Sequence, residues 1–431
     1  MEVETISIVI FILGGFILLF GLTSLVIKER LYISEASVAI ACGIIFGPLC
    51  ANFINVESWG DEDMITKQFC RIVIGIQVMA VGVALPKAYL RKEIVSLAML
   101  LLPIMIYMWL MSGLLVWGLI PGVNFLESLM IAACFTPTDP VLANSVVQGK
   151  FAEKKVPAHV RNLISCESGA NDGLGYPFLF LAIYLLQMNT GAAIGKWAYW
   201  IMAYNILLSF VIGFVVGYVA RKLLKFAEQR KLIDKESFLV FAVALALFLM
   251  GGVGLIGSDD LFACFIAGNS FTWNDWFRVE TEQAHLMEPW SSFSDAAIQI
   301  TAWRLVVLAI LVLLLRRLPI VLTLYKYIPA IRNWREALFT GWFGPIGVGA
   351  IFYYQVAIES VPEDGPNGHA RAVMLPVVYF LVLSSVIVHG ITVPLFHIGT
   401  FAKRTLTRTS EKSQLRLPVY KPLSTTQPKL I

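Results

Sequence analysis

Charged side chains are scarce in this chain of 431 residues. Asp, Glu, Lys and Arg make up 14% of it, while 58% is hydrophobic and the mean hydropathy is +0.75. Soluble domains contain roughly 25% charged residues, so this chain has too few to cover a surface that faces water on every side. The composition excludes a soluble enzyme, a disordered scaffold and a nucleic-acid binder.

Motifs for redox, metal and nucleotide chemistry are missing as well. The six cysteines show no CxxC spacing, which leaves no indication of a disulfide framework or a thiolate metal site. No GxxxxGK[ST] motif occurs, so a nucleotide-driven pump is not indicated. We therefore expect neither an enzyme nor a cofactor-binding protein.

Long apolar runs fill the chain instead. They recur from end to end at roughly the twenty residues that cross a bilayer core, and they predict an all-α, polytopic membrane protein. The first run follows Met1-Glu2-Val3-Glu4, which lacks the basic residues of a signal peptide, so we expect a spanning helix there. Twelve spans are predicted, near 6–27, 34–53, 70–86, 94–120, 124–147, 158–186, 198–222, 237–256, 258–273, 303–325, 337–357 and 372–397.

The distribution of Lys and Arg orients these spans. Fifteen basic residues lie in the loops after spans one, three, five and seven, and three lie in or beside the alternate loops. Because basic loops stay in the cytoplasm, this bias predicts an outer N-terminus.

The same rule fails in the last third of a twelve-span topology. There it would put the connector with Arg332 outside, the loop with Glu359 inside and the basic tail outside. One more crossing between residues 275 and 303 would repair all three assignments, but Ser291–Ala302 is too short and polar to supply it. We therefore predict that one helix is missing from this region.

The fifth span is interrupted at Phe135–Pro140. Pro137 and Pro140 remove backbone donors and break the helix, and unwound backbone inside a membrane is tolerated where it lines a cavity or packs on protein. Between the prolines, Thr138 offers a hydroxyl for an alkali cation and Asp139 could cap a half-helix. A structural kink with a capping Asp is the alternative interpretation.

The sixth span carries an acidic cluster, Glu167–Gly173. Helical spacing places Glu167 and Asn171 on one face and Ser168 and Asp172 on the adjoining face. Carboxylates at this depth are expensive, which marks them as functional candidates. The cluster predicts a site for a cation, a proton or each in turn, against the alternative of an inert contact between helices.

The second half repeats the pattern of an interrupted span. Phe343–Gly349 breaks the eleventh span, and one broken segment per half indicates an inverted-repeat transporter with a midplane site. Arg316 and Arg317 end the tenth span, where they either balance buried acids or anchor the helix. Asp259 and Asp260 begin the ninth span as a helix cap, a cation-attracting rim, or both.

Taken together, these motifs resemble those of the fungal plasma-membrane sodium/proton antiporters, in the cation/proton antiporter superfamily (monovalent cation:proton antiporter 1 type). The resemblance covers nearly the whole membrane region. It implies an inverted-repeat fold of thirteen helices with two crossing broken helices, so twelve spans would be one fewer. The matching segments are Phe46–Pro48, Thr138–Leu142, Glu167–Gly173, Asp259–Leu261, Arg316–Pro319 and Phe343–Val348.

The resemblance implies the ion ligands. It makes Asp172 the carboxylate that binds the cation and the proton alternately, with Na⁺ or Li⁺ also held by the side-chain oxygens of Thr138 and Ser168. The carbonyl oxygen of Thr136 is implied as a further ligand.

It also implies a supporting frame. Glu167 would pair with the arginine after the tenth span, placed at Arg317 with Arg316 as the alternative. Asn171 occupies the position of a second Asp in electrogenic relatives, but electrogenic fungal members share the Asn, which leaves the stoichiometry open.

The function implied is export of cytoplasmic Na⁺ and Li⁺, with K⁺ left open, against incoming H⁺, for salt tolerance and pH homeostasis. We expect a plasma-membrane homodimer in contact with lipid, with an exchanger domain over 1–397 and a basic, disordered cytoplasmic tail over 398–431. Two rivals remain: a sodium-coupled solute symporter, and a transport-dead homologue that acts as a sensor or assembly partner.

Overall fold

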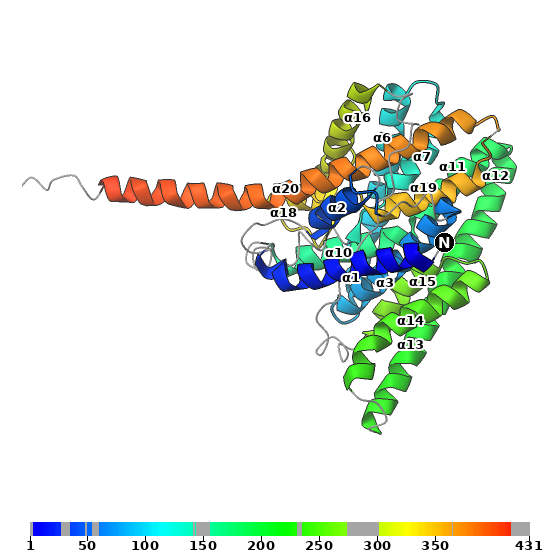
Figure 1. Ribbon diagram of the computed structural model, residues 1–431, viewed down its shortest axis with the longest axis horizontal. Coiled ribbons are helices and arrows are strands. Elements are labelled where there is room, and N and C mark those ends of the chain that lie inside the picture. Colours follow the sequence, from blue (N-terminus) through cyan, green and yellow to red (C-terminus); the bar gives the residue numbers. More distant parts are fainter. Residues whose placement is uncertain are drawn as a thin grey trace, which may run out of the picture.

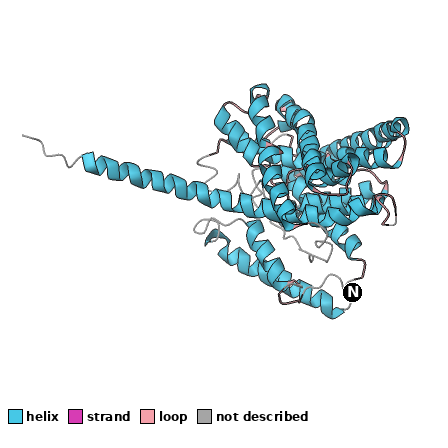
Figure 2. Ribbon diagram, turned by 90° about the horizontal axis from the view of Figure 1, so that it is seen from above, coloured by secondary structure: helices cyan, strands magenta, loops and turns pink. Residues whose placement is uncertain are grey.

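Regular structure in the computed structural model is helical wherever it is described (Figure 2). The described residues are 3–26, 35–47, 50–53, 60–140, 143, 156–230, 235–273, 301–363 and 365–414. Within them, five helices are long and apolar enough to cross a membrane, namely Glu62–Ala84, Ile94–Leu119, Thr190–Gln229, Ala302–Tyr327 and Gly368–Thr392. Shorter apolar helices lie before and between these five, as expected of a multi-pass membrane protein.

The helices of the first half are α1 (Val3–Val26), α2 (Glu35–Phe46), α3 (Glu62–Ala84), α4 (Tyr89–Lys92), α5 (Ile94–Met99), η3 (Leu100–Ile104), α6 (Met105–Leu119), α7 (Phe125–Phe135), α10 (Ala158–Gly173) and α11 (Gly175–Gln187). The second half contains α12 (Thr190–Lys196), η4 (Trp197–Leu207), α13 (Leu208–Gln229), α14 (Lys235–Leu255), α15 (Asp260–Phe271), α16 (Ala302–Leu315), α17 (Leu318–Leu324), η7 (Tyr325–Tyr327), α18 (Trp334–Trp342), α19 (Val348–Ser360) and α20 (Gly368–Gln414).

Several predicted spans are divided in the structure. The run 94–120 becomes α5, η3 and α6, where Pro103 lies inside the π-helical η3 and lacks the N–H of a regular turn. The run 337–357 is split into α18 and α19. The last helix is longer than expected, because α20 stays helical to Gln414, beyond the predicted start of the tail at 398.

The helices form two groups with α10 between them. One group contains α3 with α13, α14 and α15, and the other contains α6, α7, α11, α16, α19 and α20 (Figure 1). The helix α10 packs on both α3 and α15, and α19 also reaches α3. The polar cluster predicted on α10 therefore lies where the two groups meet.

Close packing within the first group depends on small residues. Gly213 and Gly217 of α13 face Ala263 and Ala267 of α15, and a Cβ at either glycine would overlap a carbonyl oxygen of α15. Small residues allow helices to approach closely in a membrane, where no difference in hydrophobicity drives association.

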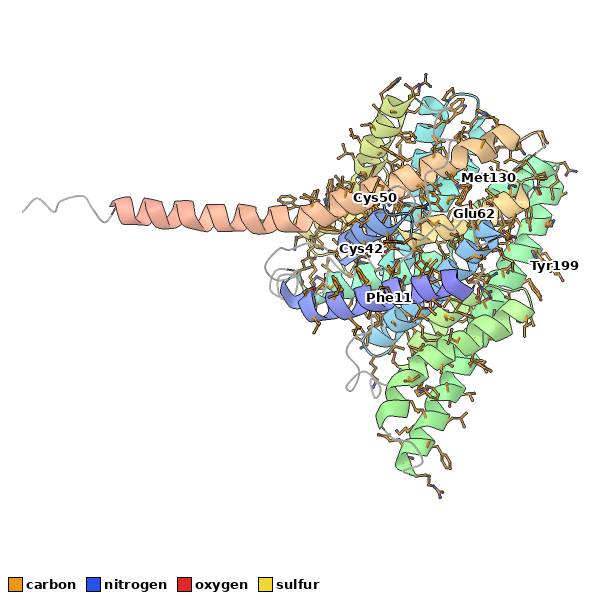
Figure 3. The ribbon with its side chains drawn as sticks, in the orientation of Figure 1. Phe11, Cys42, Cys50, Glu62, Met130 and Tyr199 are labelled. Atoms are coloured by element: carbon orange, nitrogen blue, oxygen red, sulfur yellow. The ribbon has the colours of Figure 1, made fainter. Side chains whose placement is uncertain are left out.

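Large apolar side chains cover the outside of the bundle. Tyr199 on η4 is 70% exposed and projects from the edge of the molecule, and Phe11 on α1 is 80% exposed (Figure 3). Meanwhile Glu167, Ser168, Asn171 and Asp172 of α10 are buried. This inside-out distribution suits a surface that faces lipid.

Contacts between helix ends fix the relative directions of the spans. At the end of α15, Thr272 donates a hydrogen bond to the Gly82 carbonyl, near the end of α3 from which the short α4 leads to α5. At the start of α16, Arg304 binds the Leu119 carbonyl, at the far end of α6. The described ends that flank residues 274–300 thus lie at opposite ends of the bundle. The predicted loss of a helix falls on 274–300, outside the described residues, and stays a prediction.

Candidate functional site

The first break begins where α7 ends. The helix starts with a capping box, in which Asn124 accepts from the Glu127 N–H and Glu127 accepts from the Asn124 N–H. It ends at Phe135, because Pro137 and Pro140 follow and cannot donate main-chain hydrogen bonds.

The second break separates α18 from α19. The helix α18 ends at Trp342, and residues 343–347, which include Pro345, have no helical structure before α19 begins at Val348. The interruption predicted at Phe343–Gly349 is therefore present.

The two breaks contact each other directly. The Asp139 N–H donates to the Pro345 carbonyl at 2.9 Å, and the Val348 N–H donates to Asp139 Oδ2 at 3.1 Å. Asp139 thus caps the half-helix α19 from across the crossing, where a carboxylate is favoured by the positive end of the helix dipole. The sequence predicted a capping role but not which half-helix would be capped.

The residues of the acidic cluster on α10 are buried around the first break. Asn171 accepts from the Thr138 N–H at 3.1 Å and donates to Thr138 Oγ1 at 3.0 Å. Thr138 Oγ1 lies 3.0 Å from Ser168 Oγ. Thr138, Ser168 and Asn171 therefore form one network, and Asp172 follows Ser168 by one helical turn.

Asp172 lies at the end of α10 and meets the start of α19. The break after α10 has a sequence cause, since Pro177 has no N–H for the Gly173 carbonyl one turn earlier. A Cβ at Gly349 would lie 2.8 Å from Asp172 Oδ1, and the Tyr353 hydroxyl donates to the Asp172 main-chain carbonyl. Asp172, 1% exposed as a residue, thus lies buried beside the first turns of α19.

The buried arginines hold the two breaks in different ways. Arg317 forms the expected pair with Glu167 through both of its terminal nitrogens, with Nη2 2.7 Å from Oε2, and its Nε donates to the Thr340 carbonyl at 2.9 Å. Arg316 instead donates to the main-chain carbonyls of Phe135 and Gly344. One guanidinium therefore neutralises an acid, and the other satisfies carbonyls freed at both breaks.

Known proteins with similar sequences decide the family. The family model described as "Sodium/hydrogen exchanger, transmembrane" matches residues 15–398. The chain belongs to the sodium/hydrogen exchanger family. A Schizosaccharomyces pombe protein named "Probable Na(+)/H(+) antiporter" is 46% identical over 423 residues, which are 90% of this chain and 56% of that protein. A second S. pombe protein, named "Na(+)/H(+) antiporter", is 34% identical over 452 residues, and the match covers 97% of this chain and 97% of that protein.

The chain spans about half the length of several relatives. It covers 56% of the first S. pombe protein, and 45% and 54% of two further fungal antiporters. Among solved structures, the sodium proton antiporter MjNhaP1 of Methanocaldococcus jannaschii at pH 8 superposes with a TM-score of 0.66 at 14% identity, over 90% of this chain and 97% of that one. This likeness confirms the antiporter fold predicted for the exchanger.

Two predicted site residues of the exchanger lie apart from the crossing. Asp259 is the N-cap of α15 and accepts from the Phe262 N–H at 2.9 Å, so the capping interpretation is confirmed. Asp260 in the first turn pairs with Arg71 of α3, with Nε and Oδ2 2.7 Å apart. Both acids belong to the group of α3 and α15.

The Thr136 carbonyl has a partner that the sequence did not predict. Arg316 Nη1 lies 3.4 Å from this oxygen and donates to it. A cation bound there would share the oxygen with a guanidinium, so this carbonyl is a weaker candidate ligand than the hydroxyls of Thr138 and Ser168.

Several contacts of the site were not predicted from the sequence. Gly349 and Tyr353 contact Asp172 from α19, and Ser385 and His389 of α20 contact the second break. The spacing of four residues within each pair predicts a shared helical face, which is a signal that could have linked them. Nothing in the sequence showed that these faces would meet α10 or the break.

Proposed function

We propose that this exchanger moves Na⁺ and Li⁺ out of the cytoplasm in exchange for H⁺, with Asp172 as the shared binding group. The observation that carries the proposal is the placement of Asp172 on α10, one helical turn after Ser168 and beside Gly349 of α19, while the Ser168 hydroxyl lies 3.0 Å from the Thr138 hydroxyl in the first break. One carboxylate and neutral oxygens suit an alkali cation, since hard cations prefer oxygen ligands. Among the described residues, no group of three His, Cys, Asp or Glu could hold a metal of higher charge.

The exchange follows from competition for one carboxylate. A bound cation lowers the proton affinity of Asp172, and a bound proton removes the charge that attracts the cation. Each half-cycle therefore carries one ion or the other. Alternating access would come from movement between the two helix groups, whose boundary passes beside α10.

The surrounding residues are proposed as a frame for the ion ligands. Asn171 orients Thr138, Asp139 and Arg316 hold the breaks, and Arg317 neutralises Glu167. The Thr136 carbonyl is the weakest proposed ligand. Asp259 and Asp260 are proposed to support the group of α3 and α15, as the cap of α15 and as the partner of Arg71.

The cellular setting is also proposed. We place the exchanger in the plasma membrane as a homodimer surrounded by lipid, with K⁺ as an additional cation to be tested. The exchanger domain would extend over 1–397, and the basic segment 398–431 would lie in the cytoplasm. His369, at the start of α20, lies near the Pro121 carbonyl, at the Leu119 end of α6, which supports an inward direction for α20.

Transport in vesicles tests the proposal. Purified chain is reconstituted with a pH-sensitive dye, a pH gradient is imposed, and NaCl, LiCl or KCl is added outside. An antiporter dissipates the gradient, a symporter takes up sodium without obligatory proton flow, and a transport-dead homologue does neither.

Asp172→Asn should be folded and inactive, whereas Asp63→Asn at the start of α3 should behave like wild type. Exchange above a few per cent of wild type in Asp172→Asn would overturn the mechanism.

A further inference from the structure

Two polar side chains of α20 contact the second break from both of its ends. His389 Nε2 lies 3.0 Å from the carbonyl oxygen of Trp342, the last residue of α18. Ser385 Oγ accepts from the Ile346 N–H at 2.8 Å and lies 3.2 Å from His389 Nδ1. The two side chains are one helical turn apart, and together they bridge the unwound segment from Trp342 to Ile346. We call this pair of side chains, Ser385 and His389, the splint.

The main-chain groups at this break need such partners. Ending α18 and restarting α19 leaves carbonyls and amides without helical hydrogen bonds. Residues 343–348 are all buried, so water is not at hand to replace the lost bonds. A buried main-chain group without a partner is costly, and more so inside a membrane. Ser385 satisfies the amide of Ile346, and His389 adds a second hydrogen bond to the carbonyl of Trp342, which also accepts from the Gly344 N–H at 3.0 Å.

The hydrogen-bond roles follow from the chemistry of the end groups. The Trp342 carbonyl can only accept, so His389 Nε2 carries a proton. The Ile346 N–H can only donate, so Ser385 Oγ accepts with a lone pair and keeps its own proton for His389 Nδ1. In the neutral imidazole, Nδ1 accepts from the Ser385 hydroxyl. Nδ1 also lies 2.9 Å from the Ser385 main-chain carbonyl oxygen, so an imidazolium would donate to that carbonyl in the same geometry and keep its bond to Trp342.

The splinted segment holds the partners of Asp139. Ile346 lies between Pro345, whose carbonyl accepts from the Asp139 N–H, and Val348, whose N–H donates to Asp139 Oδ2. A shift at Ile346 would move both contacts and, with them, the neighbouring ligand Thr138. Ser385 and His389 bind main-chain groups of Ile346 and Trp342, so their effect on the site passes through the main chain.

We propose that Ser385 and His389 are positioning residues of the ion site, which hold the second break in the shape that receives Asp139. The proposal rests on the proposed exchange at Asp172. It requires a donor at position 389 for the Trp342 carbonyl and a second polar group that faces Ser385, and it does not depend on the protonation state of His389. Glutamine supplies both groups from a neutral amide.

Paired substitutions in the reconstituted chain test the splint. Ser385→Ala is compared with Ser384→Ala, the same change at the preceding residue, and His389→Ala with His389→Gln. We expect Ser385→Ala and His389→Ala to raise the KM for Na⁺ roughly tenfold, as loss of a buried hydrogen bond would, with maximal rate per folded protein within about twofold of wild type. Ser384→Ala and His389→Gln should stay near the wild-type KM.

A second measurement follows the main chain directly. The rate of amide hydrogen exchange in the peptide that contains Ile346 should increase in Ser385→Ala and not in Ser384→Ala.

Each other result overturns the inference. An unchanged KM in Ser385→Ala and His389→Ala removes the positioning role, and so does equal damage from His389→Gln and His389→Ala. If Ser385→Ala and His389→Ala both fail to fold, or if hydrogen exchange at Ile346 is unaltered, the side chains serve folding alone. Wild-type chain run in parallel separates the two proposals: absence of Na⁺-driven proton flux there refutes the exchange itself, whereas normal flux with unaffected variants refutes only the splint.

Discussion

At the residue scale, the site around Asp172 is built from few side chains with separate duties. Thr138 and Ser168 place two hydroxyl oxygens 3.0 Å apart. The Asn171 side chain accepts from the main-chain N–H of Thr138 and donates to the Thr138 hydroxyl. Because these oxygens are neutral, they can adjust the distance and number of ligands around a cation without changing the charge of the site.

We expect Thr138→Ala and Ser168→Ala to change the order of preference among Li⁺, Na⁺ and K⁺ while exchange continues. Water can replace one lost oxygen, at a distance that suits the three ions differently. Initial rates in vesicles against concentration of each ion measure the effect, and a shift of roughly threefold to tenfold in relative KM is expected, about 1 kcal/mol. Thr323→Ala, at an exposed hydroxyl of α17, is the control. Unaltered profiles in both variants would remove these residues from direct contact with the ion.

Gly349→Ala should impair exchange at least roughly tenfold. The added methyl group would lie 2.8 Å from Asp172 Oδ1, so the carboxylate or α19 must shift, and small displacements of reacting groups are expensive. Gly251→Ala in α14 is the matched control, because a Cβ there meets nothing within 4 Å. Alanine favours helix at both positions, so a defect confined to Gly349→Ala would reflect the site. Equal activity of the two variants would contradict the close approach.

At the element scale, buried charges make the two helix breaks stable. The breaks expose main-chain dipoles inside the bundle, and Asp139 and Arg316 compensate them at opposite ends. The pair of Arg317 and Glu167 lies beside them, with both side chains at most 3% exposed. A buried pair of this kind costs much when only one partner is removed.

Arg317→Ala should therefore destabilise the chain by about 3–5 kcal/mol, since it leaves the Glu167 carboxylate buried without its cation. The double variant Arg317→Ala with Glu167→Gln should recover part of that loss. The stability of both variants and of wild type is measured by heating each protein in detergent and monitoring the loss of folded protein by size-exclusion chromatography. A single variant as stable as the double would show that the pair has no energetic coupling.

At the scale of the whole molecule, the path of the chain raises a conflict over residues 274–300. Their composition argues against a crossing. The described helices on either side end at opposite ends of the bundle, because the end of α15 lies near Gly82 and the start of α16 lies near Leu119. Packing of many helices fixes those ends more firmly than the composition of one segment.

We therefore expect the two termini on opposite faces of the membrane. An N-terminal tag should be accessible on intact cells, and a C-terminal tag only after permeabilisation, as an odd number of crossings requires. Tags on the same face would support the predicted loss of a helix. A tag inserted after residue 122, in the connector between α6 and α7, serves as a control for the outer face.

The sequence alone determined the class of the protein and the parts of its site. Long apolar runs dictate membrane helices whatever their partners, since main-chain groups in lipid must be satisfied within the helix. The local chemistry of proline set the first break, and the spacing of Glu167, Ser168, Asn171 and Asp172 set their faces on α10. These features depend on near neighbours in the chain.

Only the tertiary structure decided which of these parts meet. Asp139 caps α19, more than two hundred residues later, and Arg316 rather than Arg317 binds the carbonyls of both breaks. Gly349, Ser385 and His389 gained their contacts in the same way. In a bundle where most helices are apolar, periodicity leaves the choice of neighbours open. The choice is made by close packing and by the need to satisfy every buried polar group at once.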